Sequence, residues 1–260
     1  VEVSPARPAI TLPSGFPLPE GGLNFRWPDP PLTQEHRLVT HKLPAALAYA
    51  RANKLDRVTL QADTPRLGIL APGKAYLDVR QALDELGLSD AEATALGLSL
   101  YKVAMPWPLE PEGAKEFALS QPALLVVEEK RALIEPQLKD ILYNLPAGTP
   151  RPDIIGKRDL SGAPLLSATG ELSVTRLAVI IGQQLLALGG PAFLGERVEA
   201  LLKAAPAPLL DLIERKPHYC SGCPHNTSTV VPEGSRALGG IGCHYMALWM
   251  ERKTETFSQM

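Results

Sequence analysis

The sequence predicts an α/β protein in which a mostly parallel sheet is covered by helices. Between Arg66 and Leu142, short apolar segments of strand length alternate with longer segments that carry apolar residues at helical spacing. This alternation is typical of parallel sheets, because a helix returns the chain to the starting edge before the next strand. The expected strands cover 67–70, 99–105 and 123–128, and the expected helices cover 76–86, 109–119 and 134–142.

The first part of the chain predicts a connector followed by a helix. Residues 1–34 are rich in proline, which fixes φ and removes backbone donors, so an extended connector is expected. A helical segment should follow over 35–61. Within it, apolar residues recur at helical spacing over 35–54, where Pro44 should stand early enough to be tolerated.

The α/β domain itself is expected over 62–146, and its helices have recognisable limits. Leu77, Leu83 and Leu86 are expected on the apolar side of the first helix, which Gly87 ends. Glu110 opens the second helix with an acidic first turn, which the helix dipole favours at an N-terminus.

Behind this domain, residues 147–212 are expected to form an arm and helices. Proline and glycine are frequent over 146–170, which indicates a linker or an extended arm across a partner surface. Apolar residues at helical spacing then predict one helix over 171–188 and a short one over 195–204. Residues 213–260 form the last expected segment, which contains all three cysteines.

Two charged segments at strand ends are candidates for function. Gly68 to Lys74 nearly matches the phosphate-binding loop G-x-x-x-x-G-K, but Ala75 stands where Ser or Thr would hold Mg²⁺. A structural turn is therefore expected there. Glu128 and Glu129 end a buried strand, where open sheets place ligands, although a solvated edge or a salt bridge is the commoner use of such charges.

Composition and charge exclude several classes of protein. The chain has 260 residues and a net charge of −2, without the basic excess that nucleic acids or anionic membranes attract. No apolar run approaches the ~20 residues of a membrane span, and no secretory signal is recognisable, so a cytoplasmic location is expected. The first residue is Val1 and the last residues lack the composition of a tail, which indicates a piece of a longer chain.

The three cysteines predict a metal site more than a disulfide. Their number is odd, and they cluster as a C-x-x-C pair and a third cysteine, with nineteen residues between the pair and the third. Zinc in a Cys₃His site and a 4Fe–4S cluster that takes a fourth ligand from elsewhere both suit three thiolates, and a redox-active dithiol is a third possibility. The spacing alone favours zinc. The candidate ligands are Cys220, Cys223 and Cys243, with His218, His225 or His244 as the fourth zinc ligand.

Two glycines beside these cysteines give the backbone the freedom that a metal site at this spacing needs. Gly222 permits the tight turn that brings two thiolates onto one metal. Gly242 precedes Cys243 and would let the backbone approach a cluster or ligand closely.

The order of the motifs carries a family resemblance. Cys-Ser-Gly-Cys-Pro-His at 220–225, followed by Gly-Ile-Gly-Cys at 240–243, resembles the start of the thiamine-diphosphate domain of indolepyruvate ferredoxin oxidoreductases, within the 2-oxoacid:ferredoxin oxidoreductase family. Upstream, 66–142 is similar to the transketolase C-terminal-type domain that precedes it. The resemblance covers most of 35–260 and is strongest over 214–260.

This resemblance implies an organisation and a reaction. Residues 62–146 would be the transketolase C-terminal-like domain, and 213–260 the truncated beginning of a thiamine-diphosphate and iron–sulfur domain. The parent would be an oxidoreductase that decarboxylates aryl pyruvates such as indolepyruvate, with coenzyme A as co-substrate and ferredoxin as electron acceptor. It would be an oligomer that includes the missing domains or subunit, without nucleic acid or membrane partners. A zinc-stapled, non-catalytic interaction domain is the alternative.

The resemblance also implies site residues. Cys220, Cys223 and Cys243 would hold a 4Fe–4S cluster whose fourth ligand lies outside the chain. Gly242 and Cys243 would lie near thiamine diphosphate. His225 and His244 would either contact the metal ligands or face the substrate. The glycine-aspartate-glycine signature that binds Mg²⁺ and diphosphate in the family is absent from the chain, so it is expected to be inactive alone.

Overall fold

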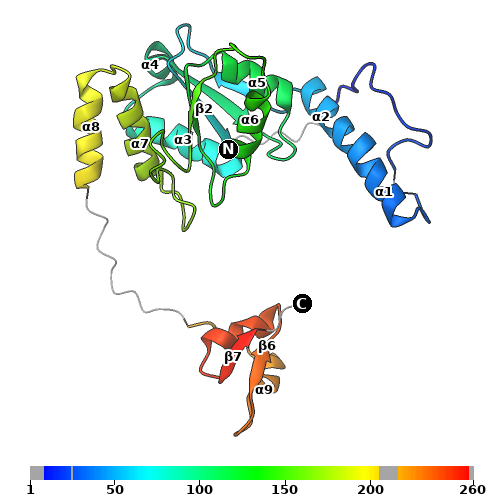
Figure 1. Ribbon diagram of the computed structural model, residues 1–260. Helices are drawn as coiled ribbons and strands as arrows, with labels where there is room; N and C mark the ends of the chain where they lie inside the picture. The colour runs from blue at the N-terminus through cyan, green and yellow to red at the C-terminus, as the bar shows by residue number, and fades with distance from the viewer. Residues whose placement is uncertain (1–8, 25, 205–215, 258–260) are drawn as a thin grey trace. The chain divides into compact units, whose positions relative to one another are not determined.

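The computed structural model describes residues 9–24, 26–204 and 216–257. The chain divides into two compact units, the first ending at Ala204 and the second running from Ala205 to Met260 (Figure 1). The expected boundary between 212 and 213 falls outside the described residues.

The first unit is built on a five-stranded sheet with the spatial order β1-β3-β2-β4-β5. Strand β1 runs antiparallel to β3, and all other neighbours are parallel. The expectation of an α/β domain with a mostly parallel sheet is therefore confirmed. The strands are β1 (Arg57–Leu60), β2 (Leu67–Pro72), β3 (Leu98–Val103), β4 (Ala123–Val126) and β5 (Asp153–Ile155).

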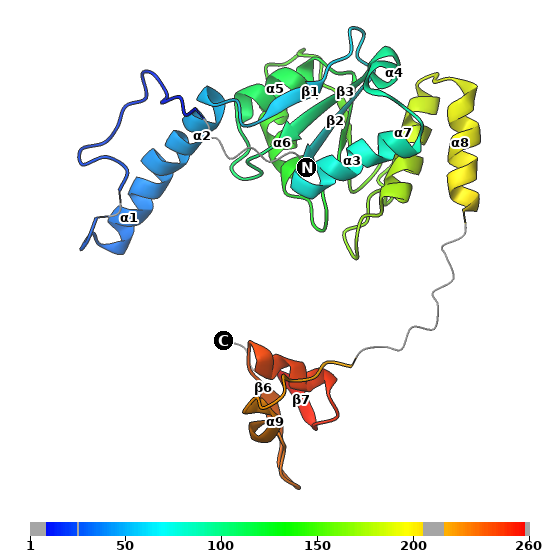
Figure 2. The ribbon, with the colours of Figure 1, turned by 180° about the vertical axis from the view of Figure 1, so that it is seen from behind.

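Helices cover both faces of this sheet (Figure 2). One face is covered by α3 (Gly73–Glu85), on which α7 (Val174–Ala187) packs, and α8 (Ala192–Lys203) packs on α7 in turn. Leu83 and Leu86 are buried as expected, but Leu77 is 52% exposed, so its expected place on the apolar side was wrong. The other face is covered by α5 (Pro111–Leu119) and α6 (Ile134–Tyr143). The short helix α4 (Asp90–Ala95) leads into β3 and begins with a capping box.

Successive side chains of the central strand, β2, pack into two separate hydrophobic cores. Ile69 packs among residues of α3 and α7, whereas its neighbour Leu70 packs among residues of α5 and α6, and neither is exposed. Successive side chains of a strand point to opposite faces, so an apolar run of this length must be covered on both sides.

The N-terminal helix is longer than expected, and its proline is internal. It runs without a break through α1 (Pro31–Arg37), the wider π-turn η1 (Leu38–Lys42) and α2 (Leu43–Ala52). Pro44 has no N–H and its ring would clash with the carbonyl four residues earlier. The π-turn relieves this crowding, and the Leu43 amide donates to the carbonyl of Leu38 instead. Pro44 is the second residue of α2, an early position as expected, although η1 and α1 precede α2 without a break.

The segment expected as an arm across a partner lies instead on its own sheet. It contributes β5, and Leu166 and Leu172 are buried in the same core as α3 and α7. Lys130 donates to the carbonyl of Gly170 at 2.6 Å, and Lys157 donates to that of Ser167 at 3.2 Å. The helices α7 and α8 therefore belong to the α/β unit and extend it beyond 62–146.

The second unit is small. Its elements are α9 (His225–Ser228), β6 (Ala237–Gly239), the 3₁₀-helix η2 (Cys243–Trp249) and β7 (Thr254–Phe257). Strands β6 and β7 form a parallel pair. Within the described parts of both units, no helix has the length and apolar character needed to cross a membrane.

Candidate functional site

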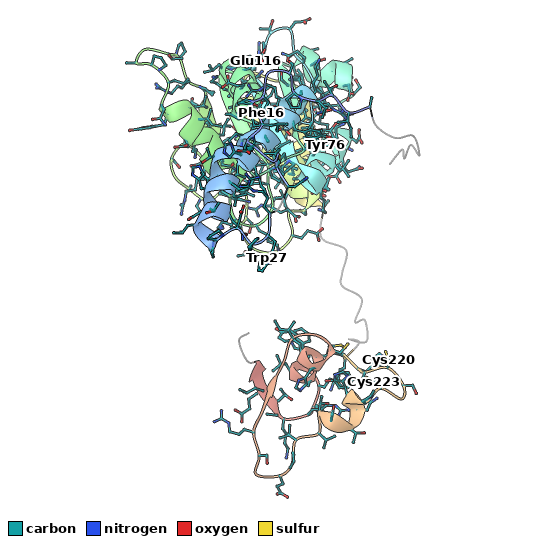
Figure 3. All side chains as sticks on the ribbon, turned by 90° about the vertical axis from the view of Figure 1, so that its right-hand side faces the viewer. Phe16, Trp27, Tyr76, Glu116, Cys220 and Cys223 are labelled. Carbon is teal, nitrogen blue, oxygen red and sulfur yellow. The ribbon has the colours of Figure 1, made fainter. Side chains whose placement is uncertain are left out.

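The C-x-x-C segment forms a tight turn in the second unit. The amide of Cys223 donates to the carbonyl of Cys220 at 3.1 Å, and Gly222 has a φ of 74° (Figure 3). A side chain at Gly222 would be strained in this left-handed conformation, so glycine is required there. Asn226 also donates its side-chain amide to the Cys220 carbonyl, at 3.0 Å, and fixes the turn against α9. This turn suits two thiolates that share one metal or cluster.

Aromatic and basic side chains hold the residues beside the turn. Sγ of Cys223 lies 3.2 Å from Nδ1 of His225, and the ring of His225 stacks on that of Tyr219 with centroids 5.3 Å apart. The guanidinium of Arg252 lies over the Tyr219 ring at 5.4 Å and donates to the carbonyl of Asn226 at 2.8 Å. Contacts between segments far apart in the sequence thus position His225.

The third cysteine follows a glycine whose conformation only glycine readily adopts. Gly242 has φ 102° and ψ −154°, and an added Cβ would meet no atom within 4 Å. Glycine is therefore required by the backbone and not by a close neighbour in this chain, and the space beside it is open. Nδ1 of His244 accepts from the amide of Gly240 at 3.2 Å, and the rings of His244 and His225 are 6.4 Å apart.

The structure brings only part of the expected ligand set together. Cys220 and Cys223 share one turn, but no group of three or more Cys, His, Asp or Glu residues is placed to hold a metal in the part of the chain that the structure describes. All three cysteines are free, with Cys220 and Cys243 exposed and Cys223 half-buried. The turn fits one side of a metal centre, and Cys243 would have to move toward it. Nδ1 of His218 lies 3.4 Å from the nearby carbonyl of Lys216.

The carboxyl edge of the sheet in the first unit is the other place where a ligand could bind. A hollow of 320 Å³ lies there, lined by Gly73, Lys74, Val103, Pro106 and others from the ends of three strands. Open parallel sheets place ligands at this edge, where successive crossovers diverge.

Ion pairs within the chain neutralise the lysine of this hollow. Nζ of Lys74 lies 2.8 Å from Asp78 and 3.4 Å from each of Glu129 and Glu171. These carboxylates raise the pKa of Lys74, the hydrogen bond to Asp78 being the largest cause. The expected structural turn at Gly73 is what the structure shows. The pairing with Glu171 was missed, because no local pattern links residues so far apart.

Glu128 has a structural use. Its carboxylate accepts from the amides of Leu133 and Ile134, both at 2.9 Å, and from that of Glu135 at 3.1 Å. It therefore caps the first turn of α6, where free amides and the helix dipole favour a negative charge.

Comparisons with known proteins identify the family. The protein-family model described as the indolepyruvate oxidoreductase domain matches residues 57–207. Indolepyruvate oxidoreductase subunit IorA of Thermococcus kodakarensis is 27% identical over 191 residues, which cover 70% of this chain and 26% of the relative. The same subunit of Methanothermobacter thermautotrophicus is 26% identical over 192 residues, with 73% and 26% covered. The chain thus spans about a quarter of the length of these relatives.

Solved structures match more weakly. A split-gene transketolase, in an inactive β4 tetramer, is 20% identical with a TM-score of 0.34 and covers 50% of this chain and 41% of its own. The 2-oxoglutarate:ferredoxin oxidoreductase from Magnetococcus marinus is 13% identical with a TM-score of 0.33, with 60% and 24% covered. The family match, in contrast, extends over more than half of the chain and includes the whole sheet of the first unit. The chain therefore belongs to the indolepyruvate oxidoreductase domain family.

Proposed function

We propose that this chain is part of an enzyme that oxidatively decarboxylates aryl pyruvates such as indolepyruvate. The bond between the carboxylate and the carbonyl carbon breaks, CO₂ leaves, and the acyl group forms a thioester with coenzyme A. The two electrons released pass to two molecules of ferredoxin. The observation that carries the proposal is the family match over 57–207, and the relatives named as an indolepyruvate oxidoreductase subunit support it.

Thiamine diphosphate with Mg²⁺ would supply the carbanion chemistry that lets CO₂ leave. Most of its binding groups would lie in parts of the enzyme outside this chain. Here, Gly242 and Cys243 are the proposed neighbours, since the space beside Gly242 is open. His225 and His244 would either contact the metal ligands or face the substrate. Because all three cysteines are free thiols, a reducing, cytoplasmic location is part of the proposal.

The cysteines are proposed as three ligands of a 4Fe–4S cluster, with the fourth supplied from outside the chain. The turn at Cys220 and Cys223 supports this, because a C-x-x-C turn presents two thiolates to one centre. Cys243 is exposed and follows the open space beside Gly242, so no close packing opposes the movement of its thiol toward a cluster held by the turn.

One observation favours a second candidate, a zinc-stapled interaction domain without catalysis. Sγ of Cys223 and Nδ1 of His225 lie 3.2 Å apart. Two ligands of one tetrahedral zinc ion, with a sulfur at roughly 2.3 Å and a nitrogen at roughly 2.0 Å from the metal, lie at a comparable separation.

Metal analysis of the complete enzyme, purified without oxygen, separates these candidates. We expect iron and acid-labile sulfide at about four of each per site. Each of Cys220→Ser, Cys223→Ser and Cys243→Ser should lose most of both, whereas Ser221→Ala, in the same turn, should keep them. Zinc without sulfide, lost also in His225→Ala, would establish the second candidate instead.

A substrate series tests the reaction. We expect the complete enzyme to form acyl-CoA from indolepyruvate and phenylpyruvate with kcat/KM at least tenfold above that for pyruvate or 2-oxoglutarate, a ratio within reach of differential binding in one pocket. The 260-residue chain alone should form none. Equal turnover of all four acids, or acyl-CoA formation by the chain alone, would contradict the proposal.

A further inference from the structure

The N-terminal arm exposes several large apolar side chains. We define the arm as residues 9–24 and 26–42. Trp27 is 81% exposed, Leu12 is 80% exposed and Leu32 is 78% exposed. The large exposed apolar side chains of the arm are Ile10, Leu12, Leu18, Trp27, Leu32, Leu38 and Val39. Large exposed apolar side chains that gather in one segment are typical of interaction sites in soluble proteins.

Polar groups hold the arm together from within. Arg37 is only 8% exposed and donates to the carbonyl of Gly22 at 2.6 Å. Asp29 pairs with Arg26 at 3.2 Å, and its carbonyl accepts from the side chain of Gln34 at 2.7 Å. Arg37 is therefore buried, and Asp29 and Gln34 are half-buried. Glu20, Arg26 and Glu35 are exposed, so the outer surface of the arm carries charged side chains as well as large apolar ones.

Two of the exposed residues share one side of the helix. Leu32 and Val39 are seven residues apart, which is about two turns, so they lie above one another on the helix surface. Trp27 lies just before this helix, at the periphery of the first unit (Figure 3). Large, stiff apolar side chains such as Trp are the residues that most often anchor protein interfaces.

The charge of the arm favours a protein partner over a membrane or a nucleic acid. Its basic residues Arg26, Arg37 and Lys42 are matched by three acidic ones, Glu20, Asp29 and Glu35. Attraction to anionic lipid or to phosphate backbones needs a basic excess, and the arm has none.

We propose that the arm is an interface with the part of the enzyme that lies beyond these 260 residues. The proposal rests on the proposed function, because it requires that the chain act within a larger indolepyruvate oxidoreductase. Its support is the outward apolar surface together with the length of the relatives, of which this chain matches about a quarter. The partner surface should be apolar and should hold pockets for the Trp27 ring and for Leu32.

Site-specific photo-crosslinking in the complete, assembled enzyme tests this interface. With Leu32→p-benzoylphenylalanine, we expect crosslinks to residues outside the 260-residue segment, identified by mass spectrometry. With the probe at Leu202, which is 62% exposed on α8, we expect none to that surface. Crosslinks only to the same segment of a second copy, or no crosslink to any protein, would overturn the proposal.

A paired variant gives an independent readout. Trp27→Ser combined with Leu32→Ser should reduce the fraction of assembled enzyme at least tenfold in a dilution series, and Leu202→Ser should leave it unchanged. The crosslink and the dilution series do not depend on turnover. An enzyme that assembles through the arm but acts on other substrates would contradict only the proposed function, and one that oxidises indolepyruvate without the crosslink would contradict only the interface.

Discussion

Asp56 joins the beginning of β1 to the loop that follows β3. Its Oδ1 accepts from the amides of Ala104 at 2.7 Å and Met105 at 3.1 Å. Its Oδ2 is buried and has no hydrogen-bond partner among the described residues. Burial raises the pKa of Asp56, with a further contribution from Glu110, and the two backbone hydrogen bonds oppose the rise only in part. The charged form is therefore unfavourable in the folded protein.

Asp56→Asn should stabilise the first unit at neutral pH. Below a pH near 3.8 the carboxyl is neutral in both states and the variant should match the wild type. As pH rises through the raised folded pKa, the wild type should lose stability relative to the variant, by up to about 1 kcal/mol, because a neutral amide is cheaper to bury than a charge. Urea unfolding at pH 3.5 and pH 7 measures this.

The control for this prediction is Asp84→Asn, at an exposed position of α3. This variant should change the free energy of unfolding neither at pH 3.5 nor at pH 7. A variant at Asp56 that is less stable at pH 7, or whose advantage is equally large at pH 3.5, would show that the carboxylate is not penalised by burial.

At the scale of elements, glycines decide how closely helices pack. Gly182 lies in α7 where α8 crosses, and an added Cβ would lie 2.5 Å from Cγ2 of Val198. Gly195 lies within α8, and an added Cβ would meet nothing within 4 Å. The two positions differ in space while sharing helical backbone, so they separate packing from helix propensity.

Gly182→Ala should destabilise the first unit by about 1–3 kcal/mol, since the extra methyl overpacks the contact with Val198. Gly195→Ala should stabilise it by about 0.5–1 kcal/mol, since alanine favours the helix and restricts the unfolded chain. Chemical denaturation of both variants under the same conditions compares them. Two changes of the same sign would mean that α7 and α8 do not pack as closely as the structure shows.

At the scale of the whole molecule, local patterns in the sequence predicted the central strands and the helices that cover them, but not the strands at the edges of the sheet. The strand around Ile69 was predictable because a run of apolar residues must be buried on both sides. β1 is only four residues long and β5 only three. Both are strands because they pair with strands distant in the sequence, and a short segment does not reveal such pairing. The burial of Leu166 and Leu172 likewise depends on helices far along the chain.

The candidate site divides in the same way. The turn at Cys220 was predictable, because Gly222 and the two-residue spacing set it locally. The contact of Arg252 with Tyr219, whose ring stacks on His225, was not predictable, because Arg252 lies in a separate segment. The family could be recognised from ordered motifs, and the family match over 57–207 confirms it through the α/β unit rather than through the cysteines.

We propose that the chain works within an enzyme that oxidises aryl pyruvates and reduces ferredoxin. The most direct test of this proposal is the stoichiometry of the complete enzyme, supplied under anaerobic conditions with indolepyruvate, coenzyme A and oxidised ferredoxin. We expect two ferredoxins to be reduced for each CO₂ released and each acyl-CoA formed, and no reduction when indolepyruvate is left out. Release of CO₂ without ferredoxin reduction, or no turnover of indolepyruvate at all, would contradict the account.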